Sequence, residues 1–259
     1  MVIKEADVEK KQIHVVIREQ EEEAQRFEER KKKIRKWMLG IIVPLMLYIF
    51  LAATDLMCFG IGLGILGFII WNVAGMRGNA KGDFLMNFLE QLQYDIKINS
   101  KVHYHLDEKP YGHASKKTWE GRSRHGNYKY KSTDHWLACN FICTDDTKVK
   151  LDFITKYKVR KGYVMKQKFI IKMVICPNPQ FYDLDSSETL SFLEETMMHH
   201  LAEHFDEPIQ TWVEPRTADN GVQFRIKLLQ QDEAYTVEQV VGFLRSIFGH
   251  FSYHTRAVG

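Results

Sequence analysis

A long apolar run limits this chain more than any other feature of its sequence. Between residues 37 and 76, Asp55 is the only charged residue. One crossing of a bilayer needs ~20 apolar residues, so the run has the length for two short crossings. We therefore predict a two-helix transmembrane hairpin with arms at Met38–Ala53 and Met57–Ala74, and with Asp55 at the turn, where its carboxylate reaches water. A single bent span with a kink at Pro44 and a buried Asp55 is the competing interpretation.

Basic residues flank both ends of the apolar run. The segment RKKKIRKW ends at Trp37, and Arg77 and Lys81 follow the run. Because Lys and Arg are retained on the cytoplasmic side, we expect an integral membrane protein with both termini in the cytoplasm. A signal peptide does not fit, since about 36 polar residues precede the run and a signal peptide begins with a much shorter charged region.

Glycines recur at helical spacing in the second arm. Gly60 and Gly64 form a GxxxG pattern, and Gly67 follows one turn later on nearly the same face. Such a face lets another helix backbone approach closely. We expect these glycines to pack against the first arm in the first instance, and a homo-oligomer is the alternative.

The apolar run divides the chain into three regions. Residues 1–36 are rich in Glu, Lys, Arg and Gln and predict a charged cytosolic helix or a weak coiled coil. Residues 37–76 are the hairpin, and residues 77–259 predict one cytosolic α+β domain with an antiparallel sheet. Within that domain, the basic and aromatic stretch 108–136 is expected to be a long loop, either disordered or functional. The other expected elements are a helix at 82–92, strands at 94–106, 134–144, 148–158 and 163–176, a helix at 186–205, a hairpin at 209–217 and 222–229, and a helix at 236–251.

One predicted strand carries lysines along a single face. Across residues 148–158, Val149, Leu151 and Phe153 alternate with polar and mostly basic residues, which predicts one buried face and one face lined by lysines. Further basic and aromatic residues occur in the next strand and in the long loop. The candidate ligand-binding residues are Lys148, Lys150, Lys156, Lys158, Lys166, Lys168, Arg122, Arg124 and Trp119.

The charge of the cytosolic domain is unevenly distributed. Residues 96–172 hold 18 Lys and Arg against 7 Asp and Glu, whereas residues 180–259 hold 5 against 13. This asymmetry either steers an anionic partner to the first half or lets the two halves complement each other. Because the domain is tethered to a membrane, we expect anionic lipid headgroups or a protein partner ahead of nucleic acid or a nucleotide.

Histidines are the strongest candidates for metal chemistry. His200 and His204 are four residues apart and share one face of a predicted helix. A catalytic zinc needs a third protein ligand and the HExxH pattern is absent, so we expect no metal and no cofactor. His135, Cys139 and Cys143, on one face of a predicted strand, are a second and weaker set. The four cysteines of the chain make no framework of the secreted kind and are expected to be reduced.

Three functional hypotheses follow, in decreasing order. The first is a membrane-anchored, non-enzymatic protein whose cytosolic domain binds an anionic ligand, lipid headgroups or a protein partner. The second is a self-associating membrane effector that perturbs the bilayer when its ligand binds. The third is a membrane-tethered, metal-dependent hydrolase. The sequence thus favours a role in binding over a role in catalysis.

Overall fold

A computed structural model of the chain comprises two compact units. The first unit contains Met1–Val16 and Lys81–Gly259, and the second contains Ile17–Ala80. The described residues are 3–52, 80–122, 126, 128–179, 187–205, 210–218, 221–231 and 233–254.

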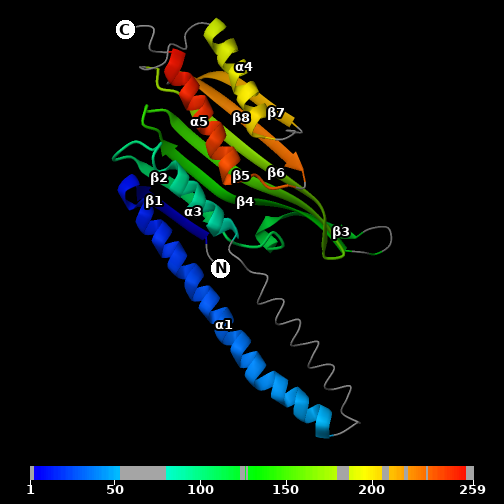
Figure 1. Cartoon of the computed structure of the whole chain (residues 1–259). Coiled ribbons are helices and arrows are strands. Elements are labelled where there is room, and N and C mark those ends of the chain that lie inside the picture. The colour runs from blue at the N-terminus through cyan, green and yellow to red at the C-terminus, as the bar shows by residue number, and fades with distance from the viewer. Residues whose placement is uncertain are drawn as a thin grey trace. The chain divides into compact units, whose positions relative to one another are not determined.

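The first unit is built on one antiparallel sheet, which confirms the predicted α+β class (Figure 1). Seven strands lie in the order β1-β2-β4-β5-β6-β8-β7, and β3 pairs with β4 outside this path. Every neighbouring pair is antiparallel. The strands are β1 (Ile3–Glu9), β2 (Lys101–Asp107), β3 (Lys117–Arg122), β4 (Tyr128–Ile142), β5 (Lys148–Arg160), β6 (Tyr163–Cys176), β7 (Gln210–Ala218) and β8 (Gly221–Gln231).

Three helices cover one face of this sheet (Figure 1). On helix α3 (Ala80–Leu92), Phe84 and Phe88 lie edge-on to Phe153 of β5, and their ring centroids are 5.3 Å and 6.0 Å from that of Phe153. This is the arrangement that aromatic rings favour in a core, and it fixes the helix against the centre of the sheet. The opposite face of the sheet carries the lysines of β5. The helices are α3 (Ala80–Leu92), α4 (Ser187–His204) and α5 (Val237–His254), and short 3-10 turns occur at Lys10–Gln12 and Ala114–Lys116.

A β-bulge in β4 changes which of its side chains face the helices. The pairing of β4 with β5 shifts between His135 and Leu137, so that Trp136 is inserted as an extra residue. Trp136 turns towards the helices, with its ring centroid 5.2 Å from that of Phe84. As a result Asp134 and Leu137 are both buried although they are three positions apart, a spacing that places residues of a regular strand on opposite faces. The bulge thus places a carboxylate under the helix layer.

Two strands were not predicted from the sequence. The sequence predicts a charged helix or weak coiled coil over residues 1–36, but Ile3–Glu9 is a strand that pairs with β2 along its whole length and buries Val8. The prediction of a loop over 108–136 is wrong in part, because β3 and the first half of β4 form a hairpin within it, with Arg122 opposite Tyr128. The alternation of aromatic and basic residues in that stretch has the period of two that is typical of a strand.

The second unit contains most of α1 (Ile13–Ala52), a continuous helix. This helix includes the charged residues 13–36, for which the sequence predicts a helix, and continues into the predicted first arm. No helix in the described parts of the chain combines the length and the apolar character needed to cross a membrane. Residues 53–79, which hold the turn and the second arm of the predicted hairpin, lie outside the described residues.

Candidate anion-binding site

Lysines of three neighbouring strands meet on the open face of the sheet. Lys158 of β5 lies directly opposite Lys131 of β4 on one side and Lys166 of β6 on the other. Two residues along, Lys156 lies opposite Lys168 of β6. These five residues, the lysine cluster, form no ion pair with any residue that the structure describes. Like charges directly opposite each other destabilise a sheet, so the lysine cluster costs stability unless an anion neutralises it.

The lysine cluster surrounds a hollow of about 250 Å³. This volume is just below the ~300 Å³ at which small-molecule pockets begin, so it suits a single charged group better than a whole cofactor. The ammonium groups and the hydroxyl group of Thr133 in the lining can donate to phosphate or carboxylate oxygens, whereas the Thr118 hydroxyl already donates to the carbonyl oxygen of Lys131 at 3.4 Å. The lining consists of Thr118, Lys131, Ser132, Thr133, Lys156, Tyr157, Lys158, Lys166 and Lys168, and it contains no carboxylate.

The face of β5 for which the sequence predicts a row of lysines is divided in two. Ile154 lies between the two lysine pairs of this strand and is buried in a small apolar cluster with Ile170 and Leu229. On the far side of Ile154, Lys148 and Lys150 lie opposite uncharged residues of β4 and β6. The four candidate lysines of β5 therefore form one pair inside the lysine cluster and one pair apart from it.

Residues of β3 and β4 border the lysine cluster. Trp119 lies opposite Lys131, and 45% of its surface is exposed. The Nζ atom of Lys129 lies 5.8 Å from the centroid of the Trp119 ring, within the range of a cation–π interaction. Arg122 is exposed at the end of β3, whereas Arg124 lies outside the described residues. Trp119 and Arg122 therefore extend the basic and aromatic surface beyond the sheet centre.

A second set of lysines lies on the helix-covered face, where carboxylates neutralise its charges. Asp134 is buried and accepts hydrogen bonds from Lys81 at 2.8 Å and from Lys116 at 2.6 Å. Lys116 also forms an ion pair with Asp107 at 3.2 Å. Both ammonium groups donate to the carbonyl oxygen of Lys109, which ties the connection between β2 and β3 to the start of α3. We call Lys81, Lys116, Asp107 and Asp134 the buried charge group.

Burial and pairing together shift the pKa values of the buried charge group. Burial lowers the pKa of Lys81 below its ordinary value, and the interaction with Asp134 opposes this shift only in part. Burial alone would raise the pKa of Asp107, but the backbone N–H of Lys109 and the Lys116 ammonium hold it below its ordinary range. Sequence reasoning missed this group because its members come from different elements and because Asp134 lies next to the bulge.

The candidate metal ligands do not converge on one point. The Nδ1 atom of His200 lies 2.8 Å from a carboxylate oxygen of Glu203, and the Nε2 atom of His204 lies 2.8 Å from the Ser246 hydroxyl. Over the residues that the structure describes, no three His, Cys, Asp or Glu side chains are grouped so that they could hold a metal ion. His200 therefore pairs with a residue of its own helix, and His204 pairs with a residue of α5.

The prediction that His135, Cys139 and Cys143 share a face is wrong. The bulge in β4 leaves His135 exposed, whereas both cysteines are buried. Cys139, Cys143 and Cys176 are free thiols, as the sequence predicts. Burial raises the pKa of Cys139 and of Cys143, so both thiols stay protonated and unreactive near neutral pH.

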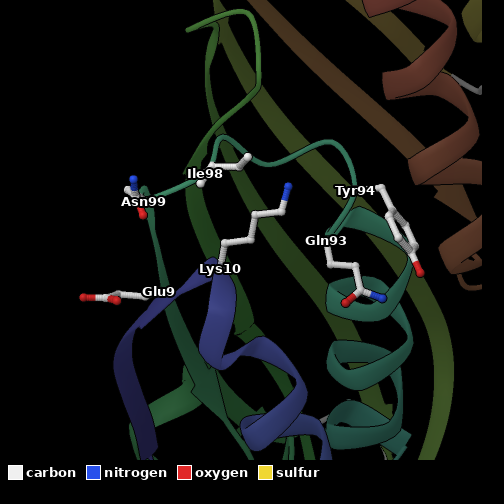
Figure 2. A pocket seen from close by; sticks show the side chains of 6 residues that line it. All are labelled: Glu9, Lys10, Gln93, Tyr94, Ile98 and Asn99. Atoms are coloured by element: carbon white, nitrogen blue, oxygen red, sulfur yellow. The ribbon is translucent and has the colours of Figure 1, made fainter.

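A second hollow, of about 280 Å³, lies where β1 meets the connection between α3 and β2 (Figure 2). Figure 2 shows Lys10 extending between the segment that carries Ile98 and the end of α3, whereas Glu9 points away. The Nζ atom of Lys10 donates to the carbonyl oxygen of Ile96 at 2.6 Å. The charge in this hollow therefore already holds the corner of the fold together, and we assign it a structural role.

Comparison of the chain with protein-family models, with curated proteins and with solved structures found no match. A functional assignment therefore rests on the chemistry of the site itself.

Proposed function

We propose that this chain is a membrane-anchored, non-enzymatic protein whose cytosolic α+β domain binds an anionic ligand at the lysine cluster. The observation that carries the proposal is the position of Lys158, which lies opposite a second lysine on each neighbouring strand. An anion bound there relieves the repulsion and accepts charge-assisted hydrogen bonds. A ligand that binds only the folded state also stabilises it, which offsets the cost of gathering the lysines.

The membrane anchor is proposed from the sequence. The run from residue 37 to 76 contains one charged residue, and basic segments flank it on both sides. A hairpin in this run, with Asp55 at its turn, leaves both termini in the cytoplasm. The lysine cluster then operates beside the anionic cytoplasmic leaflet, where each Lys near the surface contributes roughly 1 kcal/mol to attraction.

Retention of the full chain on heparin, in a neutral detergent, tests the proposal. Replacing Lys156, Lys158, Lys166 and Lys168 by Gln removes four charges from the hollow without touching the buried face. We expect this variant to elute at clearly lower salt than the wild type, because the number of charges that a polyanion meets sets the salt dependence of binding.

The sheet supplies a matched control on the same strand. Lys148→Gln combined with Lys150→Gln should change the elution salt much less per charge removed, because these lysines lie outside the lysine cluster. If both variants lower the elution salt equally per charge, retention reflects net charge alone and the assignment of a site is wrong.

The glycine pattern favours a second proposal, a self-associating membrane effector. Gly60, Gly64 and Gly67, which lie outside the described residues, have the spacing that lets helices of two chains approach closely. Ligand binding to the cytosolic domain would then assemble these helices and perturb the bilayer. Dye release from liposomes that contain the full chain, on addition of heparin, would support this second role, and intact liposomes would leave only the binding role.

A further inference from the structure

The hairpin between β5 and β6 ends in an exposed apolar tip. Its two-residue turn, Lys161-Gly162, has positive φ at both positions, 54° and 82°, which is the tight geometry that glycine favours. Directly after it, Tyr163, Val164 and Met165 are 75%, 39% and 60% exposed. Among the residues whose side-chain exposure the structure describes, no other three consecutive large apolar side chains are exposed. Neighbouring exposed apolar side chains are typical of surfaces that contact a partner or a membrane.

The apolar tip is surrounded by positive charge. The strand segments that end here, 117–122, 128–133 and 156–168, carry ten Lys and Arg residues and a single acidic residue, Glu120. Glu120 is paired with Lys117 at 2.5 Å, so it is already neutralised. The tip follows directly on the lysine cluster, because Lys158 and Lys166 are the last cross-strand pair before the bulge that leads to the turn.

We propose that this tip inserts into the headgroup region of an anionic bilayer, with Tyr163, Val164 and Met165 among the lipids and the lysine cluster on the phosphates. The inference rests on the proposed function and names its ligand as a membrane surface. Tyrosine is favoured at the water–lipid interface, and lysine stems lie along apolar surface while their ammonium groups reach the headgroups. Nucleic acid would use the lysines and Trp119 but would leave Val164 and Met165 in water.

A fluorophore at the tip tests the insertion directly in the full chain. The label is placed at Met165→Cys, in a chain whose Cys58 and Cys176 are replaced by Ser, and the protein is reconstituted in nanodiscs. The discs contain phosphatidylcholine alone or phosphatidylcholine with phosphatidylserine, plus a spin-labelled lipid that quenches on contact. We expect quenching at the tip in the anionic discs and much less in the neutral ones.

Two controls make the result specific. A label at Thr144→Cys, on the exposed turn at the opposite end of β5, should not be quenched in either lipid. Replacing Tyr163 and Val164 by Ser should reduce quenching at position 165, whereas the same change at Tyr94 and Ile98, which are at least as exposed at 75% and 72%, should not. A tip label quenched no more than the Thr144 label, or quenched equally in both lipids, overturns the inference.

The outcomes for the two proposals can be told apart. If heparin retention depends on the lysine cluster while the tip label stays in water, the site binds a soluble anion and only the insertion is wrong. If retention does not depend on the lysine cluster, the proposed function itself is wrong.

Discussion

Two groups of lysines on opposite faces of one sheet have opposite surroundings. On the helix-covered face, Lys81 and Lys116 share the carboxylate of Asp134 and are held by backbone carbonyl oxygens. On the open face, Lys158 lies between two other lysines. Removing the buried carboxylate shared by two lysines is costly, whereas exposed lysines with no carboxylate beside them are solvated and can exchange water for an anionic ligand. In this chain, the presence or absence of a paired carboxylate separates the lysines with a structural role from the lysines that we propose bind a ligand.

The largest expected effect concerns the buried charge group. Asp134→Ala leaves two ammonium groups facing each other without their shared carboxylate, and breaking a buried ion pair in this way costs about 3–5 kcal/mol. We expect a correspondingly lower midpoint of denaturant unfolding for the full chain in neutral detergent.

A variant of the lysine cluster on the open face should differ from Asp134→Ala in its effect on stability. Replacing Lys156, Lys158, Lys166 and Lys168 by Gln removes like charges that lie opposite each other, so the unfolding midpoint should stay level or rise. A loss of stability in this variant comparable to that of Asp134→Ala would break the distinction between the two faces.

A smaller effect on stability is expected when the pH is lowered, because Asp107 then becomes protonated. The folded-state pKa of Asp107 lies below its ordinary value of 3.8, because hydrogen bonds from Lys109 and Lys116 outweigh the effect of burial. A carboxylate with a depressed pKa contributes stability that is fully present above its unfolded pKa and is lost as pH falls through the folded pKa. The stability difference between the wild type and Asp107→Asn should therefore be largest above pH 3.8 and shrink below it. Unfolding curves recorded across this pH range measure it, and a constant difference would place the effect of Asp107 elsewhere.

Much of the sheet and of the helix layer was predictable because it follows simple periodicity. In β5, Val149, Leu151 and Phe153 alternate with polar residues, and all three are buried as predicted. The sequence also predicts that the final helix begins at Thr236. In the structure Thr236 caps this helix by accepting a hydrogen bond from the Gln239 backbone N–H at 3.2 Å. Local patterns of this kind need no knowledge of the partner strands.

The site was predictable only in part, because it depends on register. Lys156 and Lys166 could be named from the sequence, but the pairing that gathers them, and the separation of Lys148 by Ile154, follow from contacts between strands. The buried charge group depends in addition on a bulge that alternation alone does not reveal. Long-range register therefore sets the limit of what this sequence predicts about its own site.

Acetylation of each lysine, followed by mass spectrometry on the full chain in nanodiscs, tests the distinction between the faces most directly. In discs that contain phosphatidylserine, Lys156, Lys158, Lys166 and Lys168 should react several-fold more slowly than in phosphatidylcholine alone, because anionic headgroups occupy their ammonium groups. Lys148 and Lys150 should react at the same rate in both lipids, and the buried Lys116 should react slowly in both. Equal protection of all exposed lysines would contradict the distinction between the faces, and no protection of the lysine cluster in anionic discs would contradict a membrane surface as its ligand.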